Sequence, residues 1–468
     1  MFEPSIHSTA SSCASKKLGL VAPNMHRFAE KKSPGKGRGL YAVDVLGPGE
    51  LVLCEVPSLS MQLPGNTATG VRACAHCLRL VGAMDFQLQH IAGWDERPVL
   101  PVDAEEMDLG GFVACGGGCG ALYCSQRCAQ AAWALQHKVL CTGHATARRR
   151  RALAQFEEHA HENHEGFLFA ARAVAAVLCA FEANGSNIQS ALAPFAVLCG
   201  AEWWRGSAEP GMSPSSAASS AAPQGQREAA DWATTAESLR LLLLALPDHP
   251  ALQPTAARGA SPWLDHAFFS KLVGKLRLNT VCVDIHNVTR EFADALRAAS
   301  AIRAARAPGG AAGRACAQPT EADRLLHDVA MRLEALSSAV EDGAGSHDWA
   351  SESSDASDGS AMDSDGSRSS DGASDEGASI EIPNVVGTAL CSTVACCNHS
   401  CEPNIEVRYG DCHDVQLWTT RAVAAGDELF ISYIENETLS FQQRRMALRE
   451  YGFTCQCARC QHESGESD

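Results

Sequence analysis

Eight cysteine and histidine residues in the first third of the chain stand in four pairs, at spacings that suit a metal-binding domain. The pairs are Cys74 with Cys77, Cys115 with Cys119, Cys124 with Cys128, and His137 with Cys141. Thiolates and imidazoles bind Zn²⁺, and a structural zinc site takes four such ligands. The last two pairs have the i, i+4 spacing that places two side chains on one face of a helix. The spacing therefore predicts two structural zinc sites, with no ligand position left open for catalysis by the metal.

Three further cysteines stand close together near the end of the sequence. They are Cys455, Cys457 and Cys460. A tetrahedral zinc site requires a fourth ligand. Cys401 is the best distant candidate because it stands in the densest polar motif of the chain, and His462 is the local alternative. Closure through Cys401 would bring residues 451–460 against residues 396–404.

The cysteine count and the apolar stretches limit the class of protein. The chain has 21 cysteines, and its N-terminus lacks the compact apolar segment of a secretion signal. In this setting cysteines are expected to be thiols and metal ligands rather than disulfides. Those outside the clusters, such as Cys54, Cys179, Cys199 and Cys282, are expected to be buried. The longest apolar stretches, 170–181 and 239–246, fall short of the roughly 20 residues that span a bilayer. We expect neither a membrane nor a secreted protein, although Ser and Lys residues near the start leave organelle targeting open.

Residues 303–379 form a long low-complexity segment, rich first in Ala, Arg and Gly and then in Ser, Asp and Gly. The chain has a net charge of −17, and residues 341–376 account for −10 of it, with 11 acidic residues and one arginine. Such a composition cannot bury enough apolar surface to offset the entropy lost on ordering. We expect disorder here, interrupted by one helix over 321–340, and a second loop or linker over 206–226.

Turn residues and apolar alternation predict short strands near both ends of the chain, and apolar residues at helical spacing predict helices between them. Residues 45–56 are expected to form a hairpin around Gly47-Pro48-Gly49. The other predicted strands are 37–43, 416–418 and 429–434, and the predicted helices lie within 148–200 and at 232–246.

Four motifs now stand out in a fixed order. They are Gly37-Arg38-Gly39-Leu40, Asn398-His399-Ser400-Cys401-Glu402-Pro403-Asn404, Glu428-Leu429-Phe430-Ile431-Ser432-Tyr433, and the stretch from Tyr451 to Cys460. In this order they resemble the SET domain of protein-lysine methyltransferases. The eight-ligand cluster, with Tyr123-Cys124 and with Trp133 before His137, resembles a MYND zinc finger. A finger inserted after the first SET strands is the organisation of the SET-and-MYND methyltransferases, and the wide gap after Cys77 is most similar to plant trithorax-related SET proteins.

The resemblance implies an α+β fold, in which small SET β-sheets are split by the MYND finger and a helical insert and closed by a C-terminal pseudoknot. The implied segments are a flexible arm (1–30), the N-terminal part of the SET domain (31–73), the finger (74–141), a helical insert with the middle of the SET domain (142–302), the disordered acidic insertion (303–379), the C-terminal part of the SET domain (380–436), and a post-SET zinc motif with the tail (437–468).

The same resemblance implies an enzyme that transfers a methyl group from S-adenosylmethionine to a lysine amine, with three structural zinc ions. The residues implied to contact this cofactor are Lys36, Arg38, Asn279, Asn398, His399, Tyr433 and Phe453. Basic side chains suit its carboxylate, an amide offers both a donor and an acceptor, and an aromatic ring can stack on adenine. Tyr433 is also the implied catalytic residue, which orients the amine and is not a strong base because a phenol has a pKa near 10.

Several residues carry a simpler interpretation. Gly37 and Gly39 alone predict only a hairpin, and His399 beside cysteines could be a metal ligand. The run Arg148–Arg151 suits a nuclear-import patch, a phosphate site or a solvated helix face.

For the whole chain we expect a histone-lysine methyltransferase of chromatin, located in the nucleus with the cytoplasm as a second location. The alternatives are a methyltransferase for a ribosomal or cytosolic protein, and an inert module whose finger binds Pro-rich peptides. The expected partners are a histone or other protein substrate and a Pro-rich peptide at the finger, with no membrane and with nucleic acid contacted at most indirectly.

Overall fold

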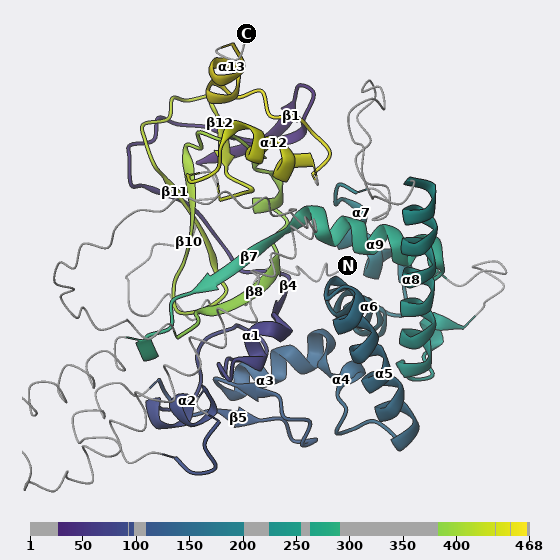
Figure 1. Ribbon diagram of the computed structural model, residues 1–468. Helices are drawn as coiled ribbons and strands as arrows, with labels where there is room; N and C mark the ends of the chain where they lie inside the picture. Colours follow the sequence, from purple (N-terminus) through teal and green to yellow (C-terminus); the bar gives the residue numbers. More distant parts are fainter. Residues whose placement is uncertain are drawn as a thin grey trace, which may run out of the picture. The chain divides into compact units, whose positions relative to one another are not determined.

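The computed structural model describes residues 27–91, 93–97, 109–200, 224–253, 263–290, 382–435, 437–449 and 451–465 (Figure 1). The chain divides into two compact units. The first contains Met1–Ala83, Asp108–His286 and Asn384–Asp468, and the second contains Met84–Met107 and Asn287–Pro383. Helix α2 (Met84–Ile91) belongs to the second unit, and all elements discussed below belong to the first. The segment 303–379, with the helix expected at 321–340, lies outside the described residues, as do residues 206–223.

The described strands of the first unit form three small sheets and one two-stranded ribbon, β5 (Val113–Ala114) with β6 (Leu122–Tyr123). The first sheet has the order β1 (Phe28–Ser33), β2 (Gly37–Ala42), β12 (Glu428–Ile431), β9 (Asn398–His399). The second has the order β10 (Ile405–Tyr409), β11 (Val415–Thr419), β3 (Leu51–Glu55). The third has the order β4 (Leu59–Gln62), β8 (Val385–Leu390), β7 (Thr280–Ile285).

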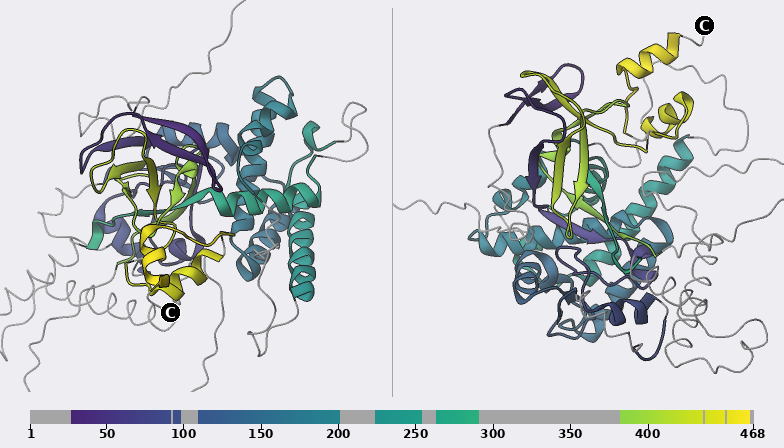
Figure 2. Two further views of the ribbon diagram at one scale, coloured as in Figure 1. Left: turned by 90° about the horizontal axis from the view of Figure 1, so that it is seen from above. Right: turned by 90° about the vertical axis from the view of Figure 1, so that its left-hand side faces the viewer.

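Each sheet combines strands from distant parts of the chain. Strand β2 pairs with β12, β3 with β11, and β4 with β8, all antiparallel. Figure 2 shows the purple N-terminal strands lying beside the green C-terminal ones. The short strand β9 pairs with β12 in parallel, so that Asn398 lies opposite Phe430 and His399 opposite Ile431. This pairing places the Asn-His pair at the end of the sheet that carries Tyr433.

The hairpin expected at 45–56 is wrong. Leu46 forms a bridge with Val423, and the backbone N–H of Gly49 donates to the carbonyl of Thr419. The chain on either side of the Gly-Pro-Gly turn therefore pairs with residues 415–423 and not with itself. The first strand also begins at Phe28, before the expected end of the arm at residue 30. The strands predicted at 37–43, 416–418 and 429–434 correspond to β2, β11 and β12.

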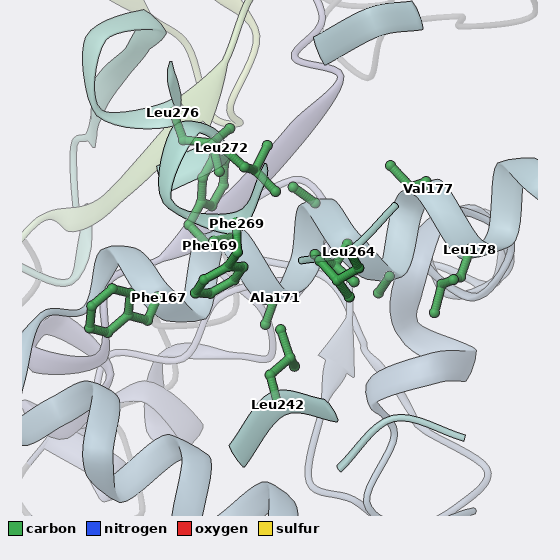
Figure 3. Close-up of a cluster of buried hydrophobic side chains, with 14 of the residues drawn as sticks. Phe167, Phe169, Ala171, Val177, Leu178, Leu242, Leu264, Phe269, Leu272 and Leu276 are labelled. Atoms are coloured by element: carbon green, nitrogen blue, oxygen red, sulfur yellow. The ribbon is translucent and has the colours of Figure 1, made fainter. Parts of the chain in front are cut away.

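The helical insert is built on α6 (Gly166–Ala183), whose buried face includes Phe167, Phe169, Val174 and Leu178. The neighbouring helices are α5 (Ala147–Asn163), α7 (Ile188–Ala196), α8 (Gln224–Ala245) and α9 (His266–Asn279). Figure 3 shows side chains of α6, α8 and α9 meeting in this core. By length and composition α6 could cross a membrane, but 61% of it is buried inside the protein, as in the core helix of a globular domain.

Helix α9 was not predicted, yet it positions part of the site. It begins after Asp265, whose side chain accepts a hydrogen bond from the backbone N–H of Phe268, as an N-cap does. It ends at Asn279, and strand β7 follows without a loop. The helix packs in the core of the helical insert, and its last residue, Asn279, lies where the chain enters strand β7 of the SET sheets.

Candidate active site and zinc centres

The eight ligands of the finger form two clusters whose members alternate along the chain. The first consists of Cys74, Cys77, Cys124 and Cys128, and the second of Cys115, Cys119, His137 and Cys141. In each cluster the four ligand atoms lie within 4.8 Å of one another. Four soft ligands at this separation suit tetrahedral Zn²⁺. The first and third pairs share one zinc site and the second and fourth share the other, so that the two sites cross-link the finger.

The helical placement expected for two of the pairs holds only in part. Cys124 precedes helix α3 (Gln126–Ala132), because Ser125 is the N-cap and accepts a hydrogen bond from the N–H of Cys128. His137 ends a π-helical turn, and Cys141 lies one residue after α4 (Lys138–Leu140). The members of each pair share a site even though no single helix carries both.

The second cluster has the chemistry that zinc requires. The Nε2 atom of His137 lies 3.3 Å from the sulfur of Cys115 and 3.4 Å from that of Cys119, so Nε2 is the ligand atom. Burial lowers the pKa of His137 to about 4, which leaves its imidazole neutral near pH 7. A neutral imidazole and three thiols are a fitting donor set for one Zn²⁺ ion.

The third cluster joins the polar motif to the end of the chain. It consists of Cys401, Cys455, Cys457 and Cys460, again with all sulfurs within 4.8 Å of one another. The predicted closure through Cys401 is therefore present, and Cys401 rather than His462 completes the set. The closure brings Phe453 next to His399, with their ring centroids 5.9 Å apart.

Arg444, on α12 (Phe441–Arg449), lies against this third cluster and is 1% exposed. Its guanidinium donates to the carbonyl of Leu439 and to the carboxylate of Glu463, and it reaches the sulfurs of Cys401 and Cys460. A Zn²⁺ ion with four thiolates carries net negative charge, so a buried cation beside it offsets part of that charge.

A cavity of about 860 Å³ lies beside the third cluster, within the size range of small-ligand sites. All seven residues predicted to contact the cofactor line it: Lys36, Arg38, Asn279, Asn398, His399, Tyr433 and Phe453. They come from β2 and its turn, α9, β9, the end of β12 and the tail. The turn around Gly37 is thus both a hairpin and a wall of the cavity.

Asn398 and His399 are held by different partners. The side-chain Nδ2 of Asn398 donates to the carbonyl of Arg38 at 2.9 Å and to Oε1 of Glu428 at 2.6 Å. The Nδ1 atom of His399 accepts from the backbone N–H of Tyr433 at 3.0 Å, and its Nε2 lies 3.3 Å from the sulfur of Cys401. His399 is therefore adjacent to the zinc ligands but outside the set of four.

Tyr433 lies in an aromatic corner of the cavity. Its ring centroid is 5.0 Å from that of Tyr451 and 6.1 Å from that of Phe453. Its hydroxyl donates to the carbonyl of Cys397 at 2.6 Å. Burial, together with the neighbouring thiol of Cys397, raises the pKa of Tyr433 well above its usual value. The hydroxyl is therefore protonated over the whole physiological range.

The predicted basic residues already have partners within the protein. The guanidinium of Arg38 lies 3.3 Å from Glu30 and donates to the carbonyl of Val197 at 2.9 Å. The ammonium of Lys36 lies 4.4 Å above the ring of Phe430. Asn279 is 3% exposed, and its amide donates to the carbonyls of Cys199 and Lys275, so it also anchors the segment that follows α7.

Several residues at the site were not predicted. Glu428, Arg444 and Tyr451 are single polar side chains within or near the motifs, and no spacing pattern distinguishes them. Cys199 lines the cavity and is exposed, as is Cys282 elsewhere, so the expectation that both are buried is wrong. The expectation overlooked that a thiol near a ligand cavity can remain exposed.

The basic run has a structural role in part. Arg149 donates to the carbonyls of Val139 and Ala245, and Arg150 donates to that of Ala145. Arg149 therefore satisfies carbonyl groups of α4 and of the last residue of α8, and Arg150 satisfies one in the loop before α5. The side chains of Arg148, Arg150 and Arg151 are exposed.

Comparisons with known proteins agree with this geometry. Residues 264–434 match the SET domain family. The protein-lysine N-trimethyltransferase SMYD5 of Gallus gallus is 25% identical, over 93% of this chain and 86% of that protein. The histone-lysine N-methyltransferase ATXR2 of Arabidopsis thaliana is 24% identical, over 75% of this chain and 63% of that protein.

A third relative matches over a shorter region. The histone-lysine N-methyltransferase SMYD3 of Mus musculus is 34% identical over 83 residues, which are 18% of this chain and 19% of that protein. The chain therefore contains a SET domain and three zinc sites, and it is similar in sequence to protein-lysine methyltransferases.

Proposed function

We propose that the chain methylates a histone lysine in the nucleus, using S-adenosylmethionine bound in the cavity of about 860 Å³. One observation carries the assignment of the site. Seven residues that lie as far apart in sequence as Lys36 and Phe453 line a single cavity. Their side chains offer an amide, cationic groups and aromatic rings, which suit the amino-acid and adenine ends of this cofactor.

When bound, S-adenosylmethionine supplies a methyl group on a positively charged sulfur. The protein has to hold the lysine amine in line with that group and keep water out, and positioning of this kind supplies a large part of a rate enhancement. The aromatic corner of Tyr433, Tyr451 and Phe453 surrounds the path of a lysine side chain with rings. Such rings also interact favourably with a cationic methylated amine.

Tyr433 positions the amine and does not remove its proton. Its hydroxyl donates to the carbonyl of Cys397, so its oxygen lone pairs are available to accept a hydrogen bond from the amine. Burial raises the pKa of Tyr433, so tyrosinate is scarce at neutral pH. The proton of the lysine therefore leaves to solvent before the methyl transfer.

The histone substrate is supported by relatives that are named histone-lysine N-methyltransferases. The second candidate is a non-histone protein. It is favoured by a relative that aligns with 93% of this chain and is named a protein-lysine N-trimethyltransferase, without mention of histone.

The inert binding module is disfavoured by the cavity itself. Asn398, His399 and Tyr433 keep their hydrogen bonds and all face one space. A Pro-rich peptide at the finger remains part of the proposal, because Trp133 is 39% exposed there and its ring lies 5.1 Å from that of His144. Exposed aromatic rings are the surfaces that Pro-rich peptides bind.

The test is transfer of labelled methyl groups from S-adenosylmethionine to purified histones and to a cell extract freed of histones. We expect histone labelling that Tyr433→Phe and Asn398→Ala each lower at least about tenfold. The matched control is Tyr409→Phe. It removes a hydroxyl that lies outside the cavity and donates a hydrogen bond to the carbonyl of Cys282. Labelling confined to the extract would favour the non-histone substrate, and no labelling with intact zinc would favour the binding module.

A further inference from the structure

Glu428 lies directly behind the amide of Asn398, at the start of β12. Its side chain is 11% exposed, and its Oε1 atom accepts the hydrogen bond from Nδ2 of Asn398 at 2.6 Å. Its second oxygen lies 3.8 Å from the ammonium of Lys36. One carboxylate therefore contacts two of the residues that line the cavity, and it contacts them from outside the cavity.

The chemistry of this contact determines which way the amide of Asn398 points. A carboxylate oxygen and a backbone carbonyl can only accept hydrogen bonds. Nδ2 has two hydrogens, one directed at Glu428 and the other at the carbonyl of Arg38. A flipped amide would place its oxygen against two acceptors, so the flip is excluded. Among the described residues no group donates a hydrogen bond to Oδ1 of Asn398, which remains available as an acceptor on the cavity side.

Gly39 makes room for this arrangement. A Cβ atom at position 39 would overlap Oε1 of Glu428 and would lie 3.1 Å from Nδ2 of Asn398. The backbone of Gly39 does not adopt a positive φ angle, so the glycine is required by close approach and not by a turn. The Gly-rich motif thus supports the pair of side chains as well as the hairpin.

We propose that Glu428 is a positioning residue that fixes Asn398 with its oxygen toward the cavity, as an acceptor for the α-ammonium group of S-adenosylmethionine. This inference rests on the proposed cofactor site. The carboxylate also polarises the amide, because accepting a hydrogen bond from Nδ2 increases the negative partial charge on Oδ1. Hydrogen bonds to a charged group are worth more than neutral ones, so loss of the orientation weakens binding by about tenfold.

Two ligands test the inference with the full-length zinc-loaded protein. They are S-adenosylhomocysteine and its analogue without the α-amino group, each titrated by calorimetry. In the wild type we expect the analogue to bind about tenfold more weakly. In Glu428→Ala the affinity for S-adenosylhomocysteine falls to that of the analogue, whose own affinity changes less than about twofold. In an Asn398→Ala background, Glu428→Ala produces no further loss, because the two residues act as one unit.

The controls separate orientation from folding. Glu428→Gln keeps the size of the side chain but can face Asn398 with either an oxygen or an amide N–H, so only the carbonyl of Arg38 still fixes the orientation. We therefore expect a smaller difference in affinity between S-adenosylhomocysteine and its analogue. Glu406→Ala removes a carboxylate that pairs with Arg408 on the surface, and it leaves both affinities unchanged.

Three outcomes count against the inference. The inference is overturned, with the cofactor site left intact, if the Glu428 variants lower the affinity for both ligands equally. It is also overturned if the losses of affinity in Glu428→Ala and Asn398→Ala add up in the double variant. Unchanged binding of S-adenosylhomocysteine in Glu428→Ala does the same. Failure of the wild type to bind S-adenosylhomocysteine overturns the proposed cofactor site and the inference together.

Discussion

The Nε2 atom of His399 lies 3.3 Å from the sulfur of Cys401, a member of the third cluster. The opposite ring nitrogen accepts a hydrogen bond from the backbone N–H of Tyr433, so it carries no proton and the proton resides on Nε2. His399 therefore donates to the zinc-binding thiolate and at the same time holds the backbone of the residue in the aromatic corner. A single imidazole links the third zinc site to the active site.

This link predicts that loss of the third zinc ion weakens cofactor binding. Cys460→Ser takes one thiolate from the cluster, and we expect zinc content to fall from three ions per chain to two. Phe453 and Tyr451 then lose their anchor, so S-adenosylhomocysteine binding falls by at least about tenfold. Zinc is measured by mass spectrometry and binding by calorimetry.

Cys282→Ser is the matched control, because Cys282 is exposed and outside the clusters. It should retain three zinc ions and full binding. Unimpaired binding in Cys460→Ser with two zinc ions would show that the aromatic corner is stable without the metal.

Arg444→Met is expected to weaken the third zinc site and to destabilise the fold. The side chain of Arg444 is 1% exposed and pairs with Glu463, which is 29% exposed, so its removal takes away a charge that is itself buried and costs more than loss of an exposed pair. We expect a lower midpoint of urea unfolding and faster release of one zinc ion to a colorimetric chelator. Arg459→Met removes the other, partly exposed partner of Glu463 and should cost less than about 1 kcal/mol. Equal effects of the two substitutions would rule out a special role for Arg444.

The sequence predicts those residues of the site whose pattern lies within a short stretch of the chain. Ligand spacing in the finger is local, so all eight ligands were predicted, yet their division between two sites depends on how the finger folds back on itself. Cys401 was predicted as a distant ligand because three thiolates require a fourth and because it stands in the densest polar motif of the chain.

Local sequence patterns could not predict which distant strands pair with each other. The turn at Gly47-Pro48-Gly49 is a strong hairpin signal, but Leu46 pairs with Val423 and β3 with β11. The turn residues determine where the chain reverses and not which strand it meets, because burial of the sheet faces selects the partner. Glu428 and Arg444 were missed for a related reason, since a single charged residue shows its role only through its contacts.

His164 predicts a pH dependence of stability. Its Nδ1 atom accepts a hydrogen bond from the backbone N–H of Gly166 at 3.0 Å. Burial, with a smaller contribution from Arg277, lowers the pKa of His164 to about 4. The unfolded chain has a histidine pKa of about 6.5, so it binds the proton more tightly than the folded protein. Stability is therefore retained above pH 6.5 and lost as the pH falls from about 6.5 toward 4, by about 2 kcal/mol at pH 5.

The measurement is urea unfolding of the wild type and His164→Asn at pH 7.5 and pH 5. The difference between the two proteins cancels the effect of zinc release at low pH. We expect the variant to lose less stability than the wild type on acidification. His161→Asn, at an exposed position in the last turn of α5, which His164 follows, should lose as much stability as the wild type. A parallel loss in all three proteins would contradict the assignment.

Tyr433 predicts the pH profile of methyl transfer. Burial raises the pKa of Tyr433, so the phenol stays protonated where the substrate lysine, with a pKa of about 10.4, begins to lose its proton. We expect kcat/KM for a peptide substrate to rise with a slope of one up to about pH 9.5. Tyr433→Phe should lower the rate about 10- to 100-fold, through loss of positioning, and leave the shape of the profile unchanged. Tyr409→Phe serves as the control with normal rates, because its hydroxyl bonds the carbonyl of Cys282 outside the cavity. If Tyr433 were instead the base, the ascending limb of the wild type would be absent from Tyr433→Phe, since the group that titrates would have been removed.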